Sequence, residues 1–124
     1  MDTALPQTIR GYAADEWNKL IDRARTYLAG VAQERRTTTY KDLQEFLSVD
    51  RFTIAYVLGE VTKREKDDGR PSLSALVLYA DRPIAGDGFT DWSKRNEWLS
   101  PSADDEESYV YWLKEMHACW VRWG

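Results

Sequence analysis

Apolar residues recur every three or four positions between Ala14 and Val31, and this spacing constrains the fold more than any other feature of the chain. Residues at positions i, i+3, i+4 and i+7 share one face of an α-helix, so the segment predicts an amphipathic helix. Two carboxylates, Asp15 and Glu16, occupy its expected first turn, where negative charge is favourable. The apolar stripe consists of Trp17, Leu20, Ile21, Ala24, Leu28 and Val31.

Two further helices are expected after a short extended segment at residues 37–40, whose β-branched and aromatic side chains favour strands. Thr39 is placed to cap a helix over residues 40–47. Ser48 and Asp50 both offer a cap for the next helix, residues 51–65, in which apolar positions again repeat at helical spacing.

The C-terminal half predicts one strand, a loop and a final helix. Residues 73–80 are apolar on both faces, which is typical of a strand covered on both sides. Turns at residues 81–83 and 85–88 favour a wing or hairpin loop. A last helix is expected from the carboxylates at residues 104–107, with a stripe formed by Tyr109, Trp112, Leu113, Met116, Trp120 and Trp123.

The length of 124 residues suits a single domain, with residues 1–12 expected as a flexible tail. The order of elements predicts the α/β (α+β) class with a winged helix-turn-helix-like core. In that arrangement residues 50–65 form the recognition helix. The N-terminal helix packs beneath the core, and the Trp-rich C-terminal helix covers the strand.

Four short motifs carry a resemblance to known proteins. They are residues 38–43, 56–61, 69–77 and 86–89. Over roughly residues 35–89 the chain resembles a group of small bacterial and phage proteins. More distantly, it is similar to the DNA-binding domain of alkylguanine alkyltransferases and their alkyltransferase-like relatives. The resemblance implies a winged-helix-like core that binds DNA.

The reactive site of that family is missing from this chain. Where the alkyltransferases carry Pro-Cys-His-Arg before a buried strand, this sequence has Pro71-Ser72-Leu73-Ser74. The tryptophan that replaces the cysteine in non-reactive relatives is also missing. The resemblance therefore supports the fold and argues against alkyl transfer.

No constellation of catalytic residues is recognisable. His117 and Cys119 are the only histidine and cysteine, and two positions along a helix separate their directions by about 200°, so they do not face one another. Zinc takes about four ligands, and no such pattern is present. The carboxylates at residues 104–107 are interpreted as helix-start chemistry, with a hard-cation site as the alternative. We expect no enzyme activity, no metal and no cofactor.

Basic residues around the predicted recognition helix favour a non-catalytic nucleic-acid-binding or regulatory module. If they converge on one face, they neutralise several phosphates of double-stranded DNA. The competing interpretation is a solvated surface of mixed charge, since acidic residues interrupt the region and the chain has a net charge of −4. The predicted nucleic-acid contacts are Arg51, Tyr56, Lys63, Arg64 and Arg82.

The alternative function is a small acidic protein-interaction module, such as an immunity protein, an inhibitor or an adaptor in phage–host conflict. Residues 71–124 carry the whole negative balance, and acidic surfaces speed association with basic partners. Aromatic side chains also dominate interface hot spots. The predicted interface residues are Tyr111, Trp112, Trp120 and Trp123.

A cytoplasmic location is expected. The single cysteine excludes an intramolecular disulfide and suits a reducing compartment. Residues 1–10 lack the apolar segment of a signal peptide. No apolar run approaches the roughly 20 residues of a membrane span, so no membrane partner is expected.

Overall fold

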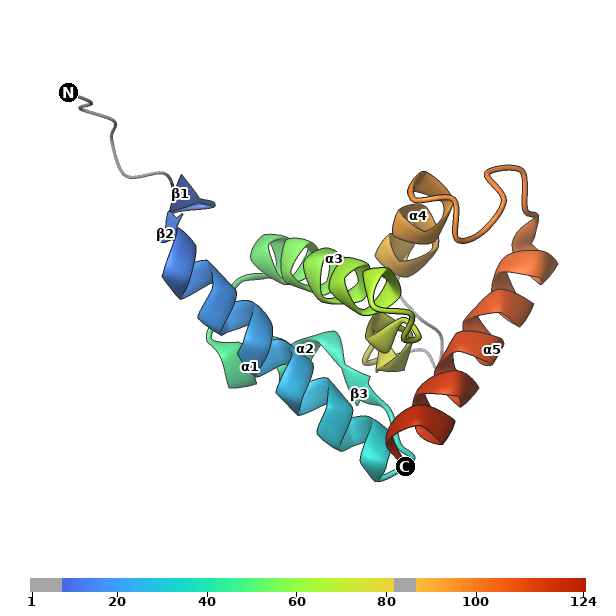
Figure 1. The fold of residues 1–124 in the computed structure, drawn as a ribbon, viewed down its shortest axis with the longest axis horizontal. Helices are drawn as coiled ribbons and strands as arrows, with labels where there is room; N and C mark the ends of the chain where they lie inside the picture. Colours follow the sequence, from blue (N-terminus) through green and yellow to red (C-terminus); the bar gives the residue numbers. More distant parts are fainter. Residues whose placement is uncertain (1–7, 82–86) are drawn as a thin grey trace.

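The computed structural model describes residues 8–81 and 87–124, and most of this chain is helical (Figure 1). The helices are α1 (Ala14–Gln33), α2 (Tyr40–Leu47), α3 (Arg51–Asp67), α4 (Asp87–Arg95) and α5 (Asp105–Trp123), with a short 3-10 helix, η1 (Leu73–Leu76). The strands are β1 (Thr8–Ile9), β2 (Tyr12–Ala13), β3 (Thr38–Thr39) and β4 (Val77–Leu78). The coarse α+β class is compatible with these elements.

Helix α1 buries the apolar stripe that its sequence predicts. Each of the six stripe residues from Trp17 to Val31 is at most 6% exposed. The stripe packs against α3, η1 and α5, and the C-terminal ends of α1 and α5 meet (Figure 1). The core therefore lies where the two long helices converge on α3 and η1.

The predicted caps of α2 and α3 are confirmed, and a third cap begins α5. The Thr39 hydroxyl accepts a hydrogen bond from the Asp42 amide at 3.1 Å and begins α2. The Asp50 carboxylate accepts one from the Thr53 amide at 2.7 Å and begins α3. At α5, Asp104 accepts from the Glu107 amide at 2.8 Å, so the carboxylates there include a helix cap.

The predicted strand at residues 73–80 is wrong over most of its length. Residues 73–76 form η1, and only Val77–Leu78 is a strand. Residues 73–77 are all buried, because α1, α3 and α5 all pack against η1. A short run that is apolar on every side does not distinguish a strand from a buried helical turn by its periodicity.

A wing hairpin after α3 is not present among the described residues. Strands β3 and β4 pair in parallel, with Thr38 opposite Val77, whereas a hairpin is antiparallel. Of the predicted turn at residues 85–88, Asp87 and Gly88 begin helix α4, which the sequence analysis missed. Residues 82–86 lie outside the described residues. The winged helix-turn-helix-like core is therefore not confirmed.

Residues 8–12, which the sequence analysis expects within a flexible tail, take part in a hairpin in the structure. Strands β1 and β2 form an antiparallel hairpin, with Ile9 opposite Tyr12. Arg10 and Gly11 form its turn with φ angles of 51° and 88°, and positive φ at both central residues is typical of a type I′ hairpin turn. The Tyr12 ring lies 5.9 Å from that of Trp17, which joins the hairpin to α1.

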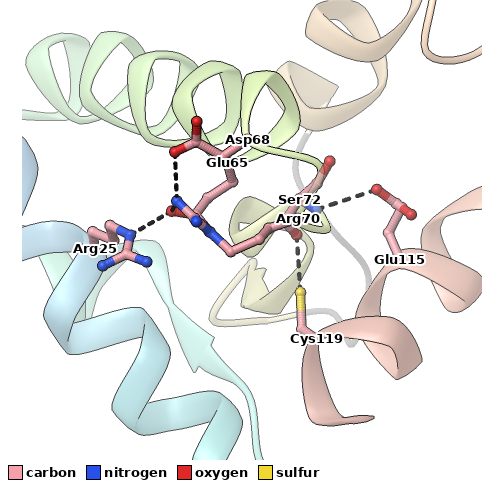
Figure 2. A network of polar contacts seen from close by, with 7 residues as sticks. All are labelled: Arg25, Glu65, Asp68, Arg70, Ser72, Glu115 and Cys119. Atoms are coloured by element: carbon pink, nitrogen blue, oxygen red, sulfur yellow. Dashed lines mark hydrogen bonds and ion pairs between the residues drawn. The ribbon is translucent and has the colours of Figure 1, made fainter. Parts of the chain in front are cut away.

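The C-terminal end of α3 is held by a buried carboxylate (Figure 2). The Glu65 side chain is 0% exposed and forms ion pairs with Arg25 of α1 and Arg70 of the following loop. Arg70 donates to both Glu65 oxygens, at 2.5 and 3.2 Å, and to Asp68 at 2.9 Å. A buried charge is tolerated only when such partners compensate its lost hydration.

The same loop is tied to α5 (Figure 2). The Ser72 amide donates to Glu115 at 3.2 Å, and the Ser72 carbonyl accepts from the Cys119 thiol at 3.3 Å. Glu115 also forms an ion pair with Lys66. Burial lowers the pKa of Lys66, but the ion pair with Glu115 outweighs burial and leaves that pKa above its ordinary value. Helices α1, α3 and α5 are thus linked by polar contacts at one end of α3.

Candidate nucleic-acid interface

The N-terminal half of α3 exposes its outer face. On the inner face, Ile54 and Val57 are at most 2% exposed and anchor the helix in the core. On the outer face, Phe52 is 60% exposed and Tyr56 is 53% exposed. These two residues are four positions apart, so their rings are neighbours on the helix surface.

Two arginines flank these exposed rings. The Arg10 guanidinium, from the β1–β2 turn, lies 4.2 Å from the centre of the Tyr56 ring. The Arg51 guanidinium lies 4.8 Å from the centre of the Phe52 ring. Within residues 8–81 and 87–124, neither arginine forms an ion pair. We call Arg10, Arg51, Phe52 and Tyr56 the α3 surface.

Asp50 places one negative charge at the edge of the α3 surface. The hydrogen bonds that Thr53 donates, first from its backbone amide, lower the pKa of the Asp50 carboxyl. Arg10 adds a smaller effect in the same direction. The cap therefore stays ionised and offsets part of the positive charge of the two arginines.

The structure separates the predicted nucleic-acid contacts into two groups. Arg51 and Tyr56 belong to the α3 surface. Lys63 pairs with Asp67 at 3.1 Å, and Arg64 pairs with Glu60 at 2.9 Å, both one turn apart on α3. Arg64 also donates to the Asn18 side chain at 2.8 Å. Arg82 lies outside the described residues.

Two members of the α3 surface were missed by sequence reasoning, Arg10 and Phe52. Arg10 was assigned to a tail, because Arg10-Gly11 is not among the Asn-Gly and Asp-Gly pairs that signal a two-residue hairpin turn. Phe52 lies off the apolar stripe of its helix, four residues before Tyr56. Large apolar side chains off the buried stripe at helical spacing indicate an exposed surface, and that signal was available.

The predicted aromatic interface on α5 packs largely against its own chain. Trp112 is 7% exposed, and its indole N–H donates to the Ala75 carbonyl at 2.8 Å, so the structure gives it a core position. Tyr111 is half-buried, 5.7 Å from the ring of Phe89. These contacts show that α5 packs against η1 and α4.

The two tryptophans near the C-terminus join α5 to α1. The Trp120 indole N–H donates to the Arg36 carbonyl at 3.1 Å. The Trp123 ring lies near two guanidinium groups, those of Arg25 and Arg122, at 5.1 and 5.0 Å. Both rings are half-buried. The more exposed apolar residues of α5 are Tyr109, Val110 and Val121.

His117 and Cys119 do not form a reactive pair. His117 is exposed, whereas Cys119 is buried and its thiol donates to Ser72. Burial raises the pKa of Cys119 to about 12, so the thiol is protonated at neutral pH. Ser72, whose carbonyl accepts from this thiol, is itself fully buried.

The part of the chain that the structure describes contains neither a cluster of metal-binding side chains nor a helix that could span a membrane. Its His, Cys, Asp and Glu residues form no group of three or more that is suited to a metal ion. None of its helices combines the length and apolar character needed to cross a membrane.

Comparison with known proteins assigns no family. No family model, no curated protein and no solved structure matches this chain. Function is therefore argued from the site alone.

Proposed function

We propose that this chain is a non-catalytic nucleic-acid-binding module that presents the N-terminal half of α3 to double-stranded DNA. The α3 surface carries this proposal, because it combines two arginines without carboxylate partners among the described residues with two exposed rings. The inner face of helix α3 is buried in the core, so α3 presents the α3 surface as part of a rigid element.

Each member of the surface has a defined role in this proposal. An α-helix fits the major groove, where Arg51 contacts guanine or a phosphate. The Tyr56 hydroxyl donates to a phosphate, and Phe52 makes apolar contact with a thymine methyl group. Arg10, in the neighbouring β1–β2 hairpin, contacts a phosphate of the DNA backbone. Each contact replaces water or a ring contact rather than an ion pair.

Lys63 and Arg64 extend the footprint along the second half of α3. Each forms an exposed or half-exposed ion pair one turn away, and such pairs contribute about 0.3–0.5 kcal/mol. Phosphates therefore displace their carboxylate partners at small cost. Arg82 stays in the proposal as a further backbone contact, outside the described residues.

The net charge makes the binding weak and sensitive to salt. The chain carries a net charge of −4, so only local positive charge attracts DNA. Each neutralised phosphate contributes about −0.9 to the slope of log affinity against log salt. Phosphate contacts from the four described cations, Arg10, Arg51, Lys63 and Arg64, therefore predict a slope of roughly −3 to −4.

The test is fluorescence anisotropy of a labelled duplex titrated with the protein across a salt series. Replacing Arg10 and Arg51 together by glutamine lowers the affinity at low salt roughly tenfold or more and reduces the slope by about 2. The matched control replaces Lys114 and Arg122, two exposed cations of α5, by glutamine. Equal losses in both double variants, or no binding at low salt, would contradict the proposal.

A protein-interaction module is the second candidate, supported by the first turns of α5. Three exposed carboxylates, at residues 105–107, precede Tyr109 and Val110, which are 51% and 42% exposed. An acidic patch beside exposed apolar groups fits a basic protein partner. A stoichiometric partner that is lost with Tyr109→Ala and Val110→Ser, and retained by the Arg10 and Arg51 double variant, supports this candidate over DNA binding.

A further inference from the structure

A cavity of about 320 Å³ lies beside the α3 surface, lined by α2, α3, α4 and the segment from Ser74 to Tyr79. Four aromatic rings form much of its wall, those of Tyr40, Tyr79, Phe89 and Trp92. Ligand cavities begin at about 300 Å³, so this one suits a molecule of one or two rings.

Gly59 brings one wall of the cavity close to α3. A Cβ atom at this position would overlap the indole ring of Trp92. The absence of a side chain therefore lets the indole ring of this α4 tryptophan lie directly against the α3 backbone. Ile54 and Leu58 complete this side and are at most 5% exposed. The walls are largely apolar and rich in aromatic rings, which favours an aromatic ligand over a strongly polar one.

Two polar features of the cavity give a ligand its orientation. The Thr62 hydroxyl donates to Ser74 Oγ at 2.6 Å, and both residues are buried. That geometry leaves the Ser74 hydroxyl hydrogen available to an acceptor in the cavity. Arg51 lines the cavity too, and its guanidinium lies 4.8 Å from the centre of the exposed Phe52 ring, without an ion pair among the described residues. Arg51 therefore brings one positive charge to the edge of the cavity.

We propose that this cavity binds a small planar aromatic carboxylate. The ring system lies against Trp92 and the tyrosines, and the carboxylate pairs with the Arg51 guanidinium. An Arg–carboxylate contact forms two parallel hydrogen bonds, which fixes the ligand's direction. Ser74 donates to an acceptor atom on the ring, where the ligand has one. The proposal does not depend on DNA binding, although both use Arg51.

The experiment uses the full chain without nucleic acid. The probes are two aromatic acids, benzoate and indole-3-acetate, and two neutral analogues, benzyl alcohol and indole. Saturation-transfer NMR detects binding, and calorimetry gives the affinity. Both acids are expected to bind saturably, and indole-3-acetate more tightly than indole.

A blocking variant tests whether the ligand occupies this cavity. Ala55 lines the cavity and is exposed, so Ala55→Phe fills the entrance without disturbing the core. The matched control is Ala14→Phe in the exposed first turn of α1. Binding of both acids is expected to be lost in Ala55→Phe and retained in Ala14→Phe. Binding that survives in Ala55→Phe would overturn the proposal.

A second variant tests the charge recognition. Arg51→Gln is expected to weaken binding of indole-3-acetate about tenfold and to leave binding of indole nearly unchanged. Equal affinity for the acid and its neutral analogue in the unmodified protein would overturn the proposal, and so would the absence of saturable binding. Because no DNA is present, either failure leaves the proposed function untouched.

Discussion

Arginines and acidic residues lie close to both ends of α3, but the arginines at the two ends make different contacts. At the C-terminal end, Arg25 and Arg70 close around a fully buried Glu65. At the N-terminal end, Arg10 and Arg51 lie over exposed rings and pair with no carboxylate in the described ranges. The sequence alone does not separate these two sets of arginines.

The two ends of α3 differ in how much hydration their charged groups lose when the chain folds. Burying Glu65 removes its hydration, and the two arginines must compensate, so they are committed to the fold. Arg10 and Arg51 keep most of their hydration, and a ring contact at an exposed site contributes only about 0.5–1 kcal/mol. Cations held this loosely are available to a phosphate or a carboxylate, and this is why we place the function at the N-terminal end.

The largest effect is expected from removing the partners of Glu65. Replacing Arg25 and Arg70 together by glutamine leaves a buried carboxylate without compensating charge, which typically costs 3–5 kcal/mol, so we expect a loss of about that size. Urea unfolding measures the change in the free energy of unfolding. The matched control, the double glutamine variant of Arg10 and Arg51, is expected to change it by less than about 0.5 kcal/mol. Similar losses at both ends would break the comparison.

Gly59 gives the next largest effect, near the middle of α3. A methyl group there overlaps Trp92, and overpacking costs about 1–3 kcal/mol, while alanine regains up to about 1 kcal/mol of helix propensity. Gly59→Ala should therefore lower the free energy of unfolding, measured in urea, by about 1–2 kcal/mol. The Trp92 ring must also move away from α3. Gly30→Ala on α1 is the control, because nothing lies within 4 Å of its Cβ position. We expect it to stabilise by about 0.5–1 kcal/mol. The same sign in both variants would refute the packing argument.

A smaller effect is expected at the cap that begins α3. The Thr53 amide lowers the pKa of Asp50 below 3.8 in the folded state, so its ionised form contributes stability above pH 4 that is lost as the pH falls through the lowered value. Asp50→Asn keeps a capping oxygen but does not titrate. Urea unfolding at about pH 6 and about pH 3 should show that the advantage of the native protein over the variant is smaller at the lower pH. A pH-independent difference would mean that the charge of Asp50 plays no part.

Local sequence signals predicted much of the fold. The stripe of α1, the caps Thr39 and Asp50, and the helix start at residues 104–107 depend on residues within one or two turns, and all are confirmed. The segment at residues 73–80 was misassigned because its conformation depends on three helices that pack around it. Helix α4 was missed because its glycine and aspartate resemble a turn.

The candidate site was only half predictable, for a related reason. Arg51 and Tyr56 were identified from their place on one helix, but Arg10 joins them through a hairpin more than forty residues earlier in the chain. The burial of Trp112 depends on η1, where its partner Ala75 lies 37 residues earlier in the chain. The pairing of Lys63 with Asp67 was accessible from its spacing of four residues, since oppositely charged residues one turn apart are neighbours on a helix.

The smallest effects are expected from the Lys63–Asp67 ion pair, which tests how far along α3 the DNA contacts extend. Lys63→Gln should change the free energy of unfolding by less than about 0.5 kcal/mol, because the pair is exposed. In the DNA titration it should weaken binding less than Arg51→Gln, since Lys63 must first leave Asp67. Asp67→Asn frees the lysine and should raise the affinity instead. Lowered or unchanged affinity in Asp67→Asn would show that the second half of α3 does not face the phosphates, and the footprint would then end near Tyr56.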